Sequence, residues 1–239
     1  MTRPMIVAHR ALTPGALENA RSSLARLVAA GADLVEMDVR ISLDRRPFVM
    51  HDALLGRTTH GHGLVRLWPS FALRRLRLRD SEDRERLAPL RKVLEIMPDA
   101  LQPALHLKDR GALRQVLRTI ERHGDPGRTW LWLEHHVDVF TAKRQLPELR
   151  CTLLRPAGWT ATARQAYFGD AQRAGAHGVS VPWGVITPDL IRLAQQHHLI
   201  VFSRLERLES VPDLVAAGLG GIITDDPERV AATLWSGSP

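Results

Sequence analysis

Residues 33–52 read DLVEMDVRISLDRRPFVMHD and place two acids, Glu36 and Asp38, a short distance before His51. The first part of the stretch alternates, and successive side chains of a β-strand point to opposite faces of the sheet. One face is therefore apolar, while the other carries both carboxylates. This alternation predicts a strand over 33–41 that directs two acids to the same side.

Similar short apolar runs recur along the chain, and most are followed by a segment of helix length. Helical crossovers join parallel strands, so eight such runs predict one closed (β/α)8 barrel, the TIM-barrel fold. The expected strands are 5–10, 33–41, 104–109, 130–135, 150–156, 178–183, 199–204 and 220–225. The expected helices are 17–31, 87–98, 112–124, 138–147, 163–176, 187–198 and 211–218.

The length of the chain, 239 residues, suits one such barrel, and no linker composition divides it. We therefore expect a single domain over 1–239. A short extended piece at 47–52 follows the second strand. After it, the arginine-rich residues 53–86 have loop character and approximate an inserted segment.

The composition argues against several classes of protein. An apolar share of 44% is ordinary for a folded chain. Cys151 is the only cysteine, and neither a signal peptide nor an apolar run long enough to span a membrane is present, so we expect a cytoplasmic protein. The net charge of +7 is concentrated in 73–92, where acids alternate with arginines as on a solvated helix. This mixture argues against nucleic-acid binding and leaves peripheral contact with anionic lipid open.

Polar residues gather late in the expected strands, and TIM barrels build their active sites at the carboxyl ends of the strands. These residues are His9, Arg10, Glu36, Asp38, His106, Lys108, Glu134, Arg155, Trp183, Arg204 and Asp225. Carboxylates as close as Glu36 and Asp38 repel each other unless a proton or a cation intervenes. A divalent ion that prefers oxygen ligands would relieve the repulsion, and so would pairing with arginines of the barrel.

The order of these motifs resembles the glycerophosphodiester phosphodiesterase family. The matching segments are AHR (8–10), LEN (17–19), 31–52, GRTTHGHG (56–63), 179–202 and 220–230. The resemblance covers nearly the whole chain. It implies a TIM-barrel enzyme that hydrolyses a glycerophosphodiester, or a related lysophospholipid, to glycerol 3-phosphate and an alcohol.

The resemblance also implies roles for individual residues. His9 and His51 occupy the positions of the catalytic acid and base, because imidazole can both take and give a proton near neutral pH. Glu36 and Asp38 become ligands of a divalent ion, Ca²⁺ or Mg²⁺. The residues implied to contact the phosphate or the glycerol end are Arg10, Lys108 and Glu18, the last of which could also face the metal.

The chain departs from the family at the strand ALHLKD, where His106 replaces the usual acidic ligand. Three readings are open: His106 itself binds the metal and favours Mn²⁺ or Zn²⁺, Glu134 supplies the missing carboxylate, or the metal binds weakly. The last reading gives an alternative function, a degenerate barrel that binds a phosphorylated ligand without turnover. The sequence leaves the alcohol group, the assignment of acid and base, a cyclic or open product and the oligomeric state open.

Overall fold

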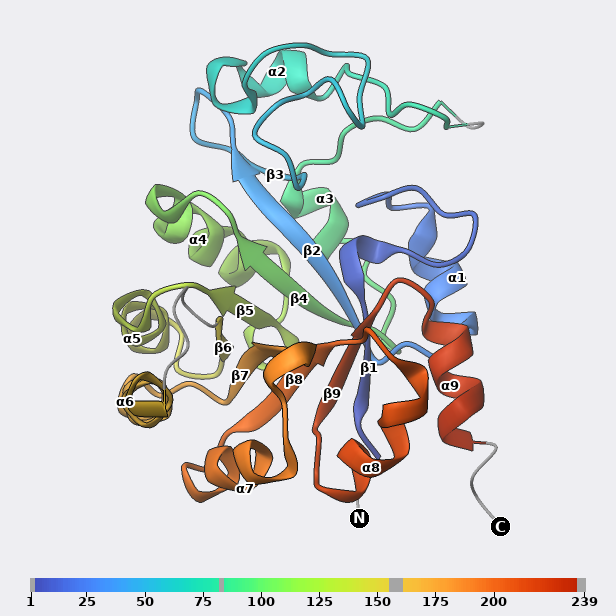
Figure 1. The fold of residues 1–239 in the computed structure, drawn as a ribbon. Coiled ribbons are helices and arrows are strands. Elements are labelled where there is room, and N and C mark those ends of the chain that lie inside the picture. The colour runs from blue at the N-terminus through green and yellow to red at the C-terminus, as the bar shows by residue number, and fades with distance from the viewer. Residues whose placement is uncertain (1–2, 82–83, 155–160, 236–239) are drawn as a thin grey trace.

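A closed barrel of eight parallel strands forms the centre of the molecule (Figure 1). The computed structural model describes residues 3–81, 84–154 and 161–235. The parallel strands are β1 (Met5–Ala8), β2 (Leu34–Ile41), β4 (Gln102–Leu107), β5 (Trp130–Leu133), β6 (Arg150–Leu154), β7 (Gly178–Pro182), β8 (Ile200–Arg204) and β9 (Gly221–Thr224). Pairing of β1 with both β9 and β2 closes the sheet. The predicted TIM barrel is confirmed.

Helices surround the barrel and connect its strands (Figure 1). The helices around the barrel are α1 (Ser23–Ala29), α3 (Leu90–Leu94), α4 (Leu113–His123), α5 (His136–Gln145), α6 (Ala161–Arg173), α7 (Pro188–Gln196), α8 (Val211–Ala216) and α9 (Pro227–Trp235). Short 3-10 helices are η1 (His9–Ala11), η2 (Val65–Leu67), η3 (Arg110–Ala112), η4 (Pro126–Arg128), η5 (Trp183–Val185) and η6 (Leu208–Ser210). Among the helices within the described ranges, none combines the length and the hydropathy needed to cross a bilayer.

The side chains on the two faces of β2 lie in different surroundings, as the alternation predicts. Val35, Met37 and Val39 belong to the large cluster that joins the strands to the surrounding helices. Leu34 belongs to the cluster inside the barrel, with Val7, Ala104, Trp130, Trp132, Phe202 and Ile223. Glu36 and Asp38 follow Leu34 on the same inward face, so the acids lie toward the carboxyl end of the barrel.

An inserted segment follows the second strand of the barrel. Strand β3 (Pro47–Val49) pairs antiparallel with β2, in the register Val39↔Val49. The chain then runs through η2 and α2 (Ser70–Leu73) at the top of Figure 1. The insertion has a small apolar core of its own, formed by Ala20, Phe48, Met50, Leu55, Val65, Leu73, Leu78 and Leu87.

The structure corrects several predicted boundaries. The first strand stops at Ala8 because Arg10 and Ala11 adopt left-handed backbone angles, with φ of 52° and 56°. The helix expected over 17–31 begins only at Ser23, because Asn19 also has a positive φ, of 57°. Helix α3 is shorter than the predicted 87–98, and α9 was not predicted. The predicted strand-end residue Arg155 lies outside the described residues.

Candidate active site

Two buried acids form the centre of the candidate site. Glu36 and Asp38 on β2 are only 2% and 1% exposed. The backbone N–H of Arg10 donates to Glu36 Oε2 at 2.8 Å, and the Asn19 side-chain amide donates to Asp38 Oδ2 at 3.3 Å. The left-handed turn at Arg10 brings this N–H to the acid. The irregular segment that follows β1 therefore supplies hydrogen bonds to both acids, from Arg10 to Glu36 and from Asn19 to Asp38.

His106 lies beside both acids. It is on β4, in register with Asp38 on the neighbouring strand. Its Nδ1 atom lies 3.4 Å from Asp38 Oδ1 and 3.7 Å from Glu36 Oε1. One ligand atom from each of the three residues falls within 4.8 Å of the others. Within the described ranges, the buried Nε2 atom of His106 has no hydrogen-bond partner.

The acids respond to this environment in opposite directions. Burial, and then the neighbouring charge of Asp38, raise the pKa of Glu36. Burial also opposes ionisation of Asp38, but contacts with His106 and Lys108 outweigh it and lower the pKa of Asp38 below its ordinary value. A cation between the two carboxylates would relieve the cost of ionising Glu36. Two buried oxygen ligands and an imidazole nitrogen therefore fit a divalent metal ion.

Protein cations also contact the acidic pair. Lys108 Nζ lies 3.3 Å from Asp38 Oδ1 and 3.3 Å from His106 Nδ1. Arg10 Nε lies 3.7 Å from Asp38 Oδ2. The sequence left metal binding and arginine pairing as alternatives, and the site contains features of both. Lys108 and Arg10 therefore place positive charge directly beside Asp38.

His51 is held on both sides of its ring. Its Nδ1 atom lies 2.7 Å from Asp52 Oδ1, and its Nε2 atom lies 2.7 Å from Nη2 of Arg10. Because the Arg10 guanidinium also contacts the acidic pair, Arg10 joins His51 to the candidate metal ligands. Arg40 adds support by donating from Nε to the backbone carbonyl of His51 at 2.7 Å.

His9 has a similar carboxylate partner at the end of the last strand. Its Nδ1 atom lies 2.7 Å from Asp225 Oδ1, and Arg204 donates to the other oxygen of Asp225 at 3.0 Å. Burial lowers the pKa of His9. Asp225 opposes this shift, while the charge of Arg204 adds to it. The imidazole of His9 is therefore favoured in its neutral form.

Glu18 is joined to the site through arginines, whereas Glu134 is largely exposed beside His106. Arg57 binds Glu18 through two hydrogen bonds, of 2.8 and 2.7 Å, and also pairs with Asp52. Arg10 Nη1 lies 3.5 Å from Glu18 Oε2, so Glu18 is joined to the site through arginines. Glu134 lies 3.9 Å from His106 Nε2, but its side chain is 62% exposed.

Sequence reasoning assigned no role to several residues that position the site. Asn19 contacts Asp38, and Arg57 links Glu18 to Asp52. Asp225 was noted only as a strand end, without its contact to His9. Asn19 lies inside the LEN motif, and Asp225 lies inside the 220–230 segment, so both offered a signal. Arg57 lies inside the matching segment GRTTHGHG (56–63), but nothing in that segment indicated which acids its side chain would contact.

The chain is similar to known proteins over nearly its whole length. The sequence model described as the glycerophosphoryl diester phosphodiesterase family matches residues 9–229. A glycerophosphodiester phosphodiesterase of Caldanaerobacter subterraneus is 25% identical over 95% of this chain and 96% of its own length.

Solved structures show the same fold. An Oleispira antarctica phosphodiesterase, in complex with the product sn-glycerol-3-phosphate, superposes with a TM-score of 0.85 at 20% identity, covering 97% of each chain. A glycerophosphodiester phosphodiesterase of Agrobacterium tumefaciens superposes with a TM-score of 0.79 at 21% identity, over 96% of this chain and 99% of that one. With a family match across most of its length, the chain belongs to the glycerophosphoryl diester phosphodiesterase family.

Proposed function

We propose that this chain hydrolyses a glycerophosphodiester, or a related lysophospholipid, to glycerol 3-phosphate and an alcohol, and so acts in lipid breakdown. Family membership supports the reaction class. The observation that carries the proposal is the position of Arg10, whose backbone binds Glu36 while its guanidinium contacts His51. One residue thereby brings the acidic pair, a phosphate-binding group and a proton-transfer group to a single place.

The proposed metal ligands are Glu36, Asp38 and His106. When bound there, a divalent ion supplies positive charge that stabilises the charge developing on the phosphate oxygens. Exchange of a hard oxygen ligand for imidazole favours Mn²⁺ or Zn²⁺ over Ca²⁺ or Mg²⁺. A metal-ligating nitrogen must be unprotonated, so binding would compete with protons at His106.

The two catalytic-position histidines share one arrangement. In each ring, Nδ1 is held by a carboxylate, Asp225 for His9 and Asp52 for His51. A carboxylate on Nδ1 orients the ring and leaves Nε2 to exchange a proton. We propose that the Nε2 atom of one imidazole takes the proton of the attacking oxygen, while the other imidazole, which enters the step with a proton on Nε2, delivers that proton to the leaving alkoxide.

Arg10 and Lys108 are the proposed phosphate contacts. A guanidinium forms charge-assisted hydrogen bonds with phosphate oxygens, which are stronger acceptors than a neutral imidazole. Arrival of the phosphodiester would therefore draw Arg10 away from His51 and free Nε2 for proton transfer. Glu18, bound by Arg57 and close to Arg10, would keep the guanidinium oriented.

The test is hydrolysis of glycerophosphocholine by chelator-treated protein, supplied separately with Ca²⁺, Mg²⁺, Mn²⁺ or Zn²⁺. We expect release of glycerol 3-phosphate, with the highest rate in Mn²⁺ or Zn²⁺. Protein that is folded and binds glycerol 3-phosphate, yet shows no turnover with any ion on this substrate or on bis(p-nitrophenyl) phosphate, would instead be the degenerate binding barrel. A cytoplasmic location stays a prediction that rests on the single cysteine, Cys151, which is buried and free.

A further inference from the structure

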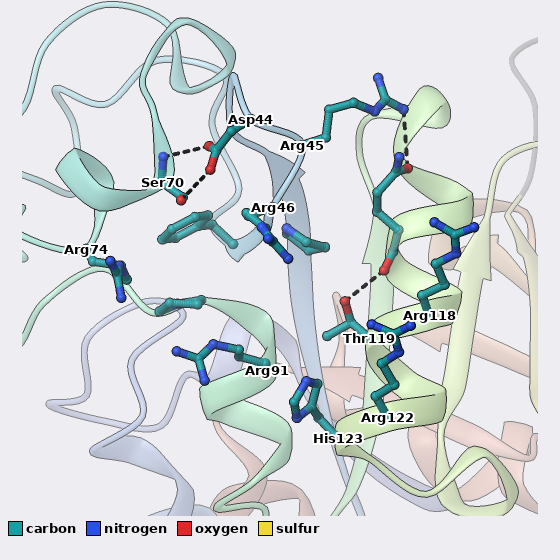
Figure 2. A pocket seen from close by; sticks show the side chains of 14 residues that line it. Asp44, Arg45, Arg46, Ser70, Arg74, Arg91, Arg118, Thr119, Arg122 and His123 are labelled. Atoms are coloured by element: carbon teal, nitrogen blue, oxygen red, sulfur yellow. Dashed lines mark hydrogen bonds between the residues drawn. The ribbon is translucent and has the colours of Figure 1, made fainter.

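A basic groove lies outside the barrel, between the insertion, α3 and α4 (Figure 2). Its cavity measures about 530 Å³. Six arginines line it, and they come from the β2–β3 turn, the end of α2, α3 and α4. They are Arg45, Arg46, Arg74, Arg91, Arg118 and Arg122. None of the residues assigned above to the candidate active site lines this groove.

Most of these arginines have no acidic partner. Within the described part of the chain, the side chains of Arg46, Arg74, Arg118 and Arg122 form no ion pair or hydrogen bond, and all four residues are exposed. Arg45 donates only to neutral oxygens, the carbonyl of Gly111 and the side chain of Gln115. Like charges gathered in one hollow repel each other, so this arrangement favours an anion in the groove.

The two acids near the groove, Asp44 in its lining and Glu95 beside Arg91, offset only part of the charge of its six arginines. The oxygens of Asp44 accept hydrogen bonds from Ser42 and from the hydroxyl and backbone N–H of Ser70. Glu95 lies 3.8 Å from Arg91, but it also pairs with Lys92 and His123. The guanidinium groups therefore remain available to an external ligand.

We propose that this groove binds a small soluble molecule that carries two or more phosphate groups. The planar guanidinium matches phosphate oxygens through paired hydrogen bonds. Because the arginines extend from elements on different sides of the hollow (Figure 2), one anionic group cannot reach them all, whereas a ligand with several can. The volume falls in the range of small-molecule sites, and a hollow suits a small ligand better than the flat surface of a bilayer.

Calorimetric titration of the full chain with inorganic tripolyphosphate, in chelator and at physiological ionic strength, tests the proposal. We expect one site per chain and weaker binding of orthophosphate. The variant Arg74→Gln/Arg118→Gln should bind tripolyphosphate about tenfold or more weakly, because it loses charged hydrogen bonds from two walls. The matched control is Arg75→Gln/Arg114→Gln, which removes the same charge from exposed neighbours that do not line the groove. The affinity of this control for tripolyphosphate should stay within about twofold of that of the unsubstituted chain, because solvent and salt screen exposed charges that lie outside the groove.

Three results would overturn the proposal. The first is the absence of tripolyphosphate binding. If vesicles containing phosphatidic acid bind the chain while tripolyphosphate does not, the groove is a lipid-docking surface instead. The second is an equal loss of affinity in the control, which would indicate general charge attraction. The third is loss of binding in His51→Ala/Lys108→Gln, which would place the anion in the active site. Melting temperatures of all variants close to that of the unsubstituted chain would confirm that they are folded.

Discussion

The Nε2 atom of His51 lies 2.7 Å from Nη2 of Arg10, and this contact decides which nitrogen of the ring accepts a hydrogen bond. A guanidinium nitrogen can only donate, so Nε2 must accept. Nδ1 then carries the proton and donates it to Asp52, 2.7 Å away. These two contacts hold the ring in a single tautomer, with Nε2 as the acceptor, until Arg10 turns to another acceptor.

Replacement of His51 by alanine should remove most hydrolytic activity and leave the fold intact. Loss of a general acid or base typically lowers the rate by about 10²- to 10⁴-fold. The melting temperature should change little, because Arg40 bonds the backbone carbonyl of His51, which alanine retains. The control is His60→Ala, an exposed histidine of the insertion, which should keep the unsubstituted rate. Full activity in His51→Ala would show that the histidine assignment is wrong.

Replacement of Asp225 or Arg204 should shift the pH dependence of the reaction in opposite directions. Asp225 raises the pKa of His9, whereas Arg204 lowers it. If His9 acts in its neutral form, activity falls as the pH drops through its pKa. Arg204→Gln should therefore move this acid limb of kcat/KM to higher pH, and Asp225→Asn should move it to lower pH. Profiles that shift in the same direction, or not at all, would show that the ionisation of His9 does not determine the acid limb of kcat/KM.

The barrel was predictable from the sequence because burial on both faces makes parallel strands short apolar runs. The placement of Glu36 and Asp38 on one face of the strand followed from the alternation alone. The left-handed turns at Arg10 and Asn19 were not predictable, because they depend on contacts with β2, which is distant in the sequence. Helical propensity was overridden only in the first part of 17–31, where Asn19 bonds to Asp38, and the helix forms from Ser23.

The positions of charged side chains were the least predictable part of the site. Whether an acid binds a metal, an arginine or a lysine depends on distances of a few ångströms between residues from different strands. The pairing of Arg57 with Glu18 and Asp52 illustrates this, because the insertion has to fold before Arg57 reaches either acid. Spacing in the sequence could indicate that His9, His51 and the acidic pair belong together, but not which cations lie between them.

Replacement of His106 by glutamate should change the metal preference of the enzyme. A third carboxylate restores a hard oxygen ligand and a negative charge, so activity in Mg²⁺ or Ca²⁺ should rise relative to Zn²⁺ or Mn²⁺. Rates with each ion, measured on chelator-treated protein, give the comparison. His135→Glu adds the same group at an exposed position close by and should leave the order of metals unchanged. An unaltered order in His106→Glu would exclude His106 from the metal site.

Replacement of Glu36 by glutamine should stabilise the metal-free protein at alkaline pH. Because the pKa of Glu36 is raised in the folded state, that state holds the proton more tightly, and stability falls as pH rises from the ordinary pKa of glutamate toward the folded value. Glutamine does not ionise, so in chelator the melting temperature of Glu36→Gln should exceed that of the unsubstituted chain at pH 9 and approach it at pH 5. Each unit of raised pKa corresponds to about 1.4 kcal/mol.

Added Mn²⁺ or Zn²⁺ should raise the melting temperature of the unsubstituted chain, which binds the ion only when folded, and scarcely that of the variant. Glu121→Gln on the exposed face of α4 provides the control and should change the melting temperature little at either pH. Equal stabilisation of Glu36→Gln and the unsubstituted chain by metal would show that the ion binds elsewhere.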